Sequence, residues 1–205
     1  MMVVALLLNA LIGCSGSQRD RSGVSERSQS VERDVMSENT ETAIIAGGCF
    51  WGMEELLRGI DGVIDSEVGY CGGENQGATY EHHPGHAEAV RIVFNPETIS
   101  FENLLVNWFF RMHDPTTLNR QGNDRGTSYR STIFYLDEEQ KVVAEKAIQT
   151  VDAAKRWPAP IVTTVEPVSN WSDAEGYHQD YLVKNPGGYT CHWLREWEPI
   201  PVGGE

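Results

Sequence analysis

The sequence predicts an α/β (α+β) domain, a two-layer sandwich with a split βαβ (ferredoxin-like) core, appended helices and a long C-terminal tail. Short apolar runs alternate with segments of helical periodicity, and glycines or prolines separate them. Their order is strand, helix, strand, strand, helix, strand, as in a split βαβ unit. The 205 residues suffice for one domain of about 150 residues plus extensions.

The first half of this domain is expected to contain three strands and one helix. The strands are short apolar runs at residues 42–46, 63–70 and 86–94. The helix begins near Cys49, because the apolar residues that follow recur at helical spacing, and it ends at Gly62.

A longer helix opens the second half. Ser100 is a good N-cap, a stripe of large apolar side chains follows it, and Pro115 ends the segment. The polar loop 120–130 comes next and is of the kind that carries functional groups. A strand at 132–136 follows the loop.

Two capping-box patterns predict the remaining helices. One helix starts at Asp137, which has a glutamine three residues later, and stops before Pro158. The other starts at Ser172, which has a glutamate three residues later, and reaches about Val183. A last strand is expected between them, at 161–168.

Charge and cysteine spacing exclude several classes of protein. With 30 acidic and 16 basic residues the formal charge is -14, which repels nucleic acid and anionic lipid surfaces. The cysteines form no CxxC pair, so neither a zinc ribbon nor a thioredoxin-type motif is present, and a disulfide scaffold is not expected. The four cysteines are Cys14, Cys49, Cys71 and Cys191.

The first residues resemble a bacterial lipoprotein signal. The expected signal peptide, residues 1–13, contains an apolar run over 1–12, apart from Asn9, that is too short to span a membrane. Leu11-Ile12-Gly13-Cys14 resembles a lipobox, whose cysteine is lipidated and becomes the new N-terminus after cleavage. Residues 14–40 are polar and predict a flexible tether. No lysine or arginine precedes the run, so an ordinary signal peptide or a misassigned start on a cytosolic protein are alternatives.

Cys49 is the leading candidate nucleophile. At a strand-to-helix junction its thiolate would be stabilised by unpaired backbone N–H groups and the helix dipole, which predicts a lowered pKa. The bulky neighbours Phe50 and Trp51 indicate an apolar cage rather than a phosphate loop. The alternative is that Cys49 is a small core residue packed between two rings.

Glu88 is the candidate acid. It shares one face of its strand with Val90, Ile92 and Phe94, because side chains alternate with period two. Burial disfavours the charged form, so a carboxyl group aimed at the apolar side tends to keep its proton near neutral pH. The alternative is a strand-end glutamate that reaches solvent or pairs with Arg91.

Other chemistries fit less well. A metal site at His82, His83, His86 and Glu88 is disfavoured because Pro84 and Gly85 interrupt the segment, and no HExxH helix is present. No GxSxG elbow supports a serine hydrolase, whereas a cysteine hydrolase stays open. A second cysteine in the tail favours redox chemistry, in which one thiol is oxidised and the other closes a disulfide.

Five ordered blocks resemble the A-class peptide methionine sulfoxide reductases. They are Gly47-Gly48-Cys49-Phe50-Trp51-Gly52, Gly69-Tyr70-Cys71-Gly72-Gly73, Gly85-His86-Ala87-Glu88-Ala89-Val90, the segment from Gln121 to Ser131, and Gln179-Asp180-Tyr181-Leu182. The resemblance covers residues 42–198 and implies that residues 41–205 form the reductase catalytic domain. It further implies reduction of methionine S-sulfoxide, free or in proteins.

The resemblance also implies roles for individual residues. Cys49 attacks the sulfoxide sulfur and Glu88 protonates its oxygen, while Cys191 resolves the resulting sulfenic acid as a disulfide. Phe50 and Trp51 hold the substrate methyl group, Tyr80 and Tyr129 hydrogen-bond the oxygen, and Asp124 lines the pocket. No cofactor or metal is expected, and a thioredoxin-like dithiol serves as reductant. Cys71 is expected to be a spectator.

Together these expectations describe a monomeric, membrane-anchored extracytoplasmic enzyme. Two rival hypotheses remain open. One rival is a thiol-disulfide oxidoreductase that acts on protein disulfides through Cys49 and Cys191. The other is a noncatalytic module that binds oxidised methionine. If the chain start is misassigned, the enzyme is cytoplasmic and Cys14 carries no lipid.

Overall fold

The computed structural model describes residues 39–203. The expected signal peptide, Cys14 and all but the last two residues of the expected tether lie outside the described residues. No helix within 39–203 is long and apolar enough to cross a membrane.

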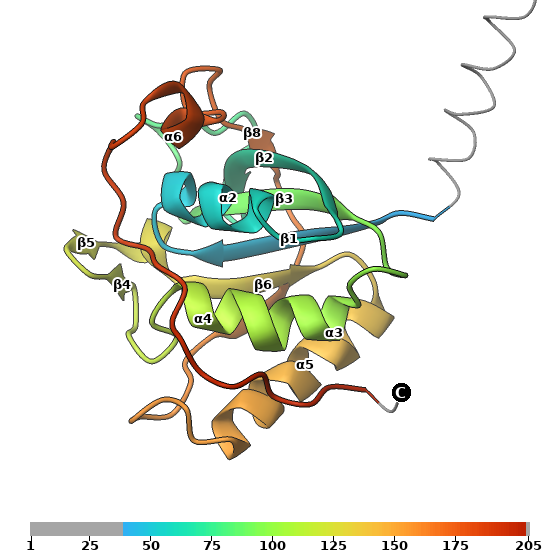
Figure 1. Ribbon diagram of the computed structural model, residues 1–205. Helices are drawn as coiled ribbons and strands as arrows, with labels where there is room; N and C mark the ends of the chain where they lie inside the picture. The colour runs from blue at the N-terminus through green and yellow to red at the C-terminus, as the bar shows by residue number, and fades with distance from the viewer. Residues whose placement is uncertain (1–38, 204–205) are drawn as a thin grey trace, which may run out of the picture. The chain divides into compact units, whose positions relative to one another are not determined.

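A six-stranded sheet forms one layer, with the strand order β7-β6-β1-β3-β2-β8 (Figure 1). The central neighbours β6-β1-β3-β2 are antiparallel, which is the arrangement of a split βαβ unit, and β7 extends the sheet in parallel with β6. The expected fold class is confirmed. The strands are β1 (Glu41–Gly47), β2 (Val63–Cys71), β3 (Ala87–Phe94), β6 (Ser131–Tyr135), β7 (Thr164–Pro167) and β8 (Ser172–Asp173).

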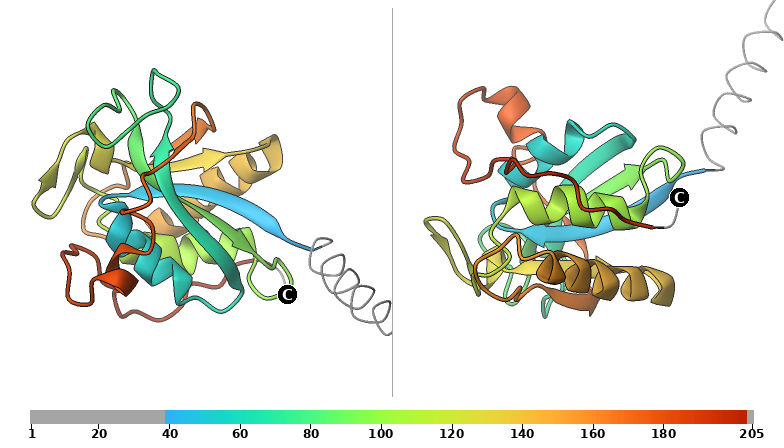
Figure 2. Two further views of the ribbon diagram at one scale, coloured as in Figure 1. Left: turned by 90° about the horizontal axis from the view of Figure 1, so that it is seen from above. Right: turned by 60° about the horizontal axis from the view of Figure 1, so that its bottom comes forward.

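Three helical segments form the other layer (Figure 2). The middle one is continuous along the chain but has wider π turns at its centre. The segments are α2 (Phe50–Arg58), then α3 (Phe101–Asn103) with η1 (Leu104–Phe109) and α4 (Phe110–Met112), then α5 (Glu138–Ala153); a short α6 (Tyr181–Lys184) follows later.

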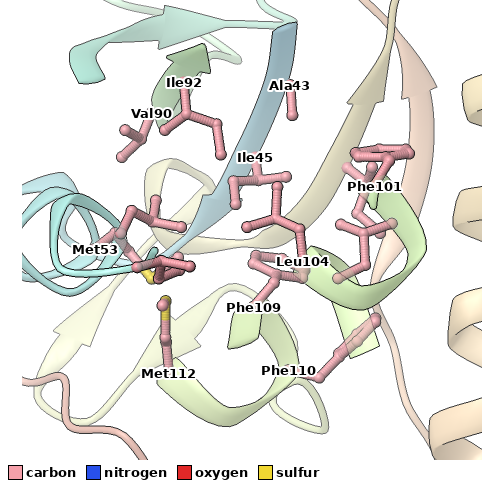
Figure 3. Close-up of a cluster of buried hydrophobic side chains, with 14 of the residues drawn as sticks. Ala43, Ile45, Met53, Val90, Ile92, Phe101, Leu104, Phe109, Phe110 and Met112 are labelled. Atoms are coloured by element: carbon pink, nitrogen blue, oxygen red, sulfur yellow. The ribbon is translucent and has the colours of Figure 1, made fainter. Parts of the chain in front are cut away.

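Alternation along the strands decides which face meets the helices. Ile45 of β1 and Val90 and Ile92 of β3 point into one cluster with Met53 of α2 and Phe109 of η1 (Figure 3). The intervening strand residues, such as Ala89, belong to a second, smaller cluster on the opposite face. The same alternation places Glu88 on the helix-covered face, so its carboxyl group is directed toward the apolar side of the sheet.

Two of the predicted helix starts are confirmed. The Ser100 hydroxyl accepts a hydrogen bond from the backbone N–H of Asn103 (3.2 Å). The Asp137 carboxylate accepts one from the N–H of Gln140 (2.8 Å). The Gln140 side chain reaches back over the helix start, where its Oε1 accepts from the N–H of Leu136 (3.1 Å), one residue before the cap. Its Nε2 donates to the carbonyl oxygen of Thr42 in β1 (2.8 Å), so it also ties α5 to the sheet.

The predicted helix from Ser172 is wrong. Ser172 lies in β8, and its hydroxyl accepts a hydrogen bond from the N–H of Ala78 (3.0 Å). The Glu175 carboxylate accepts one from the Tyr70 hydroxyl (3.1 Å). Because both side chains bind other parts of the chain, neither caps a helix here. The helix starts only at α6, after Asp180, which has a φ of 54°.

Two further segments differ from expectation. The last strand is shorter than 161–168, since β7 occupies only Thr164–Pro167. The polar loop 120–130 contains a small hairpin of β4 (Arg120–Gln121) and β5 (Asp124–Arg125). This hairpin places Asp124 beside the first part of the C-terminal tail, where it contacts Tyr189 and Cys191.

The tail, residues 185–203, crosses the helical layer without forming helix or strand (Figure 1). The Arg195 N–H donates to the Arg111 carbonyl (3.1 Å), and the Ile200 N–H donates to Asn107 Oδ1 (2.8 Å). These contacts hold the tail along η1 and α4. They bring its earlier part, including Cys191, to the N-terminal end of α2.

Candidate active site

Cys49 lies at the junction of β1 and α2, as predicted. It is the N-cap of α2 and is only 6% exposed. Gly48 before it has a φ of +111°, and a Cβ at that position would lie 2.6 Å from Cγ of Gln121. Glycine is required there both by the backbone conformation and by the close approach of the loop.

The Cys49 side chain faces a cavity of about 140 Å³. Seven of the predicted site residues meet at this cavity, although they come from four separate parts of the sequence. The predicted members are Cys49, Phe50, Trp51, Tyr80, Glu88, Asp124 and Tyr129, and Tyr189 of the tail completes the lining.

Glu88 points from β3 into this cavity and is 3% exposed. Its Oε2 accepts a hydrogen bond from the N–H of Phe50 in the first turn of α2 (3.1 Å). Arg91 binds Glu67 and Asp173 instead, so the alternative ion pair with Glu88 is not formed. Burial raises the pKa of Glu88 to about 8, against the opposing effect of the Phe50 N–H. The carboxyl group therefore carries its proton at neutral pH.

The expected lowering of the Cys49 pKa is wrong. Burial and the nearby Glu88 raise the pKa of this thiol to about 12. The N–H of Trp51 at the start of the helix does lower it, as expected, but by less. A thiolate loses more free energy through desolvation than it gains from one turn of helix. Cys49 is therefore a thiol at neutral pH.

The aromatic cage is held by residues far along the chain. The Trp51 ring stacks on Tyr181 of α6 at a centroid distance of 3.7 Å and an interplanar angle of 13°. Its indole N–H donates to Nδ1 of the buried His178 (3.0 Å). The His178 ring also lies 5.1 Å from that of Phe50. Both cage rings are therefore fixed from behind by one histidine.

Hydroxyl groups and a carboxylate border the rest of the cavity. Burial raises the pKa of the phenols of Tyr80, Tyr129 and Tyr189, so all three retain their protons at neutral pH. The Tyr189 hydroxyl donates to Oδ1 of Asp124 (3.1 Å). Tyr80 is held through its backbone, whose N–H donates to Oε1 of Glu175 (2.9 Å).

Cys191 lies beside this cavity and shares Asp124 with it. The Cys191 thiol donates to Asp124 Oδ2 (3.4 Å). Burial and Asp124 raise the pKa of this thiol to about 11, while the backbone N–H of Cys49 lowers it. The structure thus brings the predicted tail thiol to the backbone of the predicted nucleophile.

Comparison with known proteins identifies the family. The family described as "Peptide methionine sulfoxide reductase" matches residues 41–198. The chain belongs to this family.

Individual relatives agree with the assignment. "Peptide methionine sulfoxide reductase MsrA" of Nocardia farcinica is 56% identical over 161 residues, which cover 78% of this chain and 94% of the relative. The reduced form of Mxr1 from Saccharomyces cerevisiae has a TM-score of 0.72 and 37% identity, covering 78% of this chain and 94% of that one. Mxr1 in complex with Trx2 has a TM-score of 0.54 and 28% identity, covering 78% and 93%.

Sequence patterns missed four contributors to the site of this methionine sulfoxide reductase. His178, Tyr181 and Tyr189 support or line the cavity, and His192 contacts the cysteine loop. Tyr181 lay in one of the family-like blocks, and Tyr189 and His192 flank Cys191, so proximity to these motifs was the available signal. No local pattern distinguishes His178, because its partners are distant in sequence.

Two histidines of the His82, His83 and His86 segment hydrogen-bond to neighbouring parts of the chain. His83 Nδ1 binds the carbonyl oxygen of Thr79 and its Nε2 binds the Ser128 hydroxyl, both at 2.9 Å. His86 Nε2 binds the carbonyl oxygen of Asn75 (2.9 Å). Within the described part of the chain, no group of three or more histidine, cysteine or acidic side chains is placed to hold a metal ion.

Two other features lie apart from the site. Cys71 is fully buried, and its thiol donates to the Ser169 carbonyl (3.5 Å). A larger hollow of about 660 Å³ lies beside Thr42, Phe101 and Gln140, without a cysteine in its lining. The smaller cavity is the candidate active site, because its lining combines a thiol with a protonated carboxyl group.

Proposed function

We propose that this reductase converts methionine S-sulfoxide, in proteins and free, to methionine, with Cys49 as nucleophile and Glu88 as acid. The observation that carries the proposal is the joint presence of the Cys49 thiol and the Glu88 carboxyl group at one small, aromatic-walled cavity. The Phe50 and Trp51 rings provide an apolar surface for the substrate methyl group. The polar side of the cavity faces the sulfoxide oxygen.

The two raised pKa values suggest how the first step proceeds. Glu88 gives its proton to the sulfoxide oxygen, which makes the sulfur more electrophilic and leaves a carboxylate in the cavity. That carboxylate accepts the Cys49 proton as the sulfur of Cys49 attacks. The Tyr80 and Tyr129 phenols donate hydrogen bonds to the oxygen. The hydroxyl group then passes from the substrate sulfur to the sulfur of Cys49, the bond between the two sulfurs breaks, and methionine leaves with Cys49 as a sulfenic acid.

In the second step we propose that Cys191 attacks the sulfenic acid. A Cys49–Cys191 disulfide forms and water leaves. A thioredoxin-like dithiol then reduces the disulfide by exchange. The position of Cys191 at the Cys49 backbone supports the pairing. The similarity to Mxr1, whose complex with Trx2 has been solved, supports the reductant.

A single-turnover assay without added thiol tests these roles. The S and R epimers of a methionine sulfoxide peptide are presented separately to wild type, Cys49→Ser and Cys191→Ser. We expect wild type and Cys191→Ser to produce methionine from the S epimer only, and Cys49→Ser to produce none. If wild type produced methionine from neither the S nor the R epimer, the reductase function would be refuted, leaving disulfide exchange or binding.

We further propose that the enzyme works outside the cytoplasm, attached to the membrane through a lipid on Cys14. The proposal depends on the lipobox-like sequence Leu11-Ile12-Gly13-Cys14 and the polar residues that follow it. Mass spectrometry of the mature N-terminus provides the test. An unmodified Cys14, or retention of residues 1–13, would contradict the anchor.

A further inference from the structure

His192 is a buried histidine whose hydrogen bonds define its protonation. It is 7% exposed, and its Nε2 lies 2.8 Å from the carbonyl oxygen of Gly47. A carbonyl oxygen can only accept, so Nε2 carries the hydrogen. Burial lowers the pKa of His192 below 6.5, and the ring is therefore neutral at pH 7. Its other nitrogen, Nδ1, is left with a free lone pair.

That lone pair lies next to the tail thiol. Nδ1 of His192 is 3.5 Å from Sγ of Cys191. The thiol has one proton and two neighbouring acceptors, the second being Asp124 Oδ2 at 3.4 Å. The other oxygen of Asp124 accepts the Tyr189 hydroxyl. The thiol proton can thus turn from a carboxylate to an imidazole without movement of the backbone.

We propose that His192 is the base that takes the proton of Cys191 when this thiol attacks the oxidised Cys49. The inference rests on the proposed function and assigns a further catalytic residue to its second step. Only the thiolate is an effective nucleophile, and at neutral pH very little of the Cys191 thiol ionises unaided, because its pKa is raised to about 11. A base in contact with Sγ removes that obstacle.

The step balances without a further reactant. The proton of Cys191 moves to His192 Nδ1, and the sulfur lone pair forms the bond to Sγ of Cys49. The S–O bond of the sulfenic acid breaks, and the hydroxyl group leaves as water with the proton of Glu88. His192 then loses its proton to solvent, and Glu88 regains one. The net change is a thiol and a sulfenic acid converted to a disulfide and water.

The charges around His192 favour it as the acceptor. Asp124 faces it from β5 and stabilises the imidazolium, whereas Arg195 of the tail opposes it. His113, after α4, also lies near enough to interact, but burial lowers its pKa to about 3 and it stays neutral. The Cys191 thiolate formed in the step adds a second negative charge beside the imidazolium.

His192→Gln tests the assignment, because a glutamine can still donate to the Gly47 carbonyl but cannot act as a base. The full chain reacts with one equivalent of the S-sulfoxide peptide. Released methionine reports the first step, and intact mass after acid quench reports the second, since the disulfide is one water lighter than the sulfenic acid. At pH 7 we expect disulfide formation to slow about 100-fold, with accumulation of the sulfenic acid.

The pH dependence separates a base from a structural anchor. In wild type the disulfide step should be lost only at pH values lower than 6.5, as the pH falls through the lowered pKa of His192 and the ring becomes protonated. In His192→Gln the rate should instead rise with pH toward the Cys191 pKa of about 11. Thr190→Val removes the hydrogen bond from the His192 N–H to the Thr190 hydroxyl and spares Nδ1, so it should keep the wild-type pH profile.

Three results would overturn the inference. One is a wild-type disulfide step that is insensitive to acid, which needs no variant to observe. Another is His192→Gln with the wild-type rate and pH profile. The third is a disulfide step that no longer slows at low pH in Asp124→Asn but still does so in His192→Gln, which would make the Asp124 carboxylate the base. Absence of methionine with wild type would instead refute the proposed function itself.

Discussion

Replacement of Glu88 by glutamine should raise stability at alkaline pH while it removes activity. Glutamine keeps the acceptor for the Phe50 N–H, which lies 3.1 Å from Oε2, and has nearly the same volume. It cannot ionise and cannot donate an acidic proton. The variant therefore isolates the proton of Glu88 from its packing.

The magnitude follows from the pKa of Glu88, which is raised from 4.5 to about 8. Below pH 4.5 Glu88 is protonated in both the folded and the unfolded chain, so its contribution to the free energy of unfolding is fully present. As the pH rises to about 8, the unfolded chain ionises while the folded one holds its proton, which costs up to about 5 kcal/mol of stability. The difference in free energy of unfolding between Glu88→Gln and wild type should grow by about 4 kcal/mol between about pH 5 and about pH 8.

Two assays measure the two effects. Urea unfolding at each pH gives the stability difference. Single-turnover methionine formation gives the chemical step, which in wild type should be constant below about pH 8 and fall above it, as Glu88 ionises. In Glu88→Gln the rate should be about 10²- to 10⁴-fold lower and should lack this alkaline limb, the fall in rate above about pH 8.

Glu54→Gln is the matched control. Glu54 is another buried carboxyl group whose pKa burial raises, but it lies outside the cavity and binds α6. Its replacement should leave the alkaline limb of methionine formation in place. A Glu88→Gln enzyme with the wild-type rate and limb would refute the acid role, and a stability difference that does not change with pH would show that folded Glu88 is ionised.

Three further variants test the supports of the site. Tyr181→Ala removes the ring on which Trp51 stacks, and steady-state kinetics should show KM raised about fivefold with a smaller change in kcat. Glu54→Ala leaves a backbone N–H at the start of α6 without its acceptor and should lower the free energy of unfolding in urea by about 1–3 kcal/mol. Gly52→Ala would place a Cβ 2.7 Å from Nδ1 of His192, so quenched-flow mass measurement should show disulfide formation about tenfold slower while methionine release continues. An unchanged KM, an unchanged free energy of unfolding or an unchanged rate of disulfide formation would contradict the role assigned to Tyr181, Glu54 or Gly52, respectively.

The part of the site that sequence patterns predicted is built from neighbours along the chain. Period-two alternation on β3 placed Glu88 on the helix-covered face, and the glycine-flanked junction placed Cys49 at the start of α2. Both inferences use only the geometry of one strand or one helix. They held because the surrounding elements formed where their own patterns predicted.

The parts that patterns missed depend on contacts between distant residues. Ser172 and Glu175 have the spacing of a capping box, but their side chains bind Ala78 and Tyr70, about a hundred residues earlier. A local pattern states what a side chain could bind, and the fold decides which partner it meets. His178 behind Trp51 is invisible to local patterns for the same reason.

The ionisation of Cys49 shows how far a local rule extends. The helix end favours the thiolate, yet the walls that form the apolar cage also remove water from the sulfur, and their effect is larger. The same holds for Cys191, whose pKa burial and Asp124 raise. Because thiols are far less reactive than thiolates toward oxidants, both cysteines should be inert while the site is empty. In the proposed mechanism each lies beside a group that takes its proton, which is Glu88 after it has protonated the substrate and His192 after a sulfenic acid has formed. Reactivity in this site therefore depends on the arrival of the correct electrophile rather than on a permanently ionised cysteine.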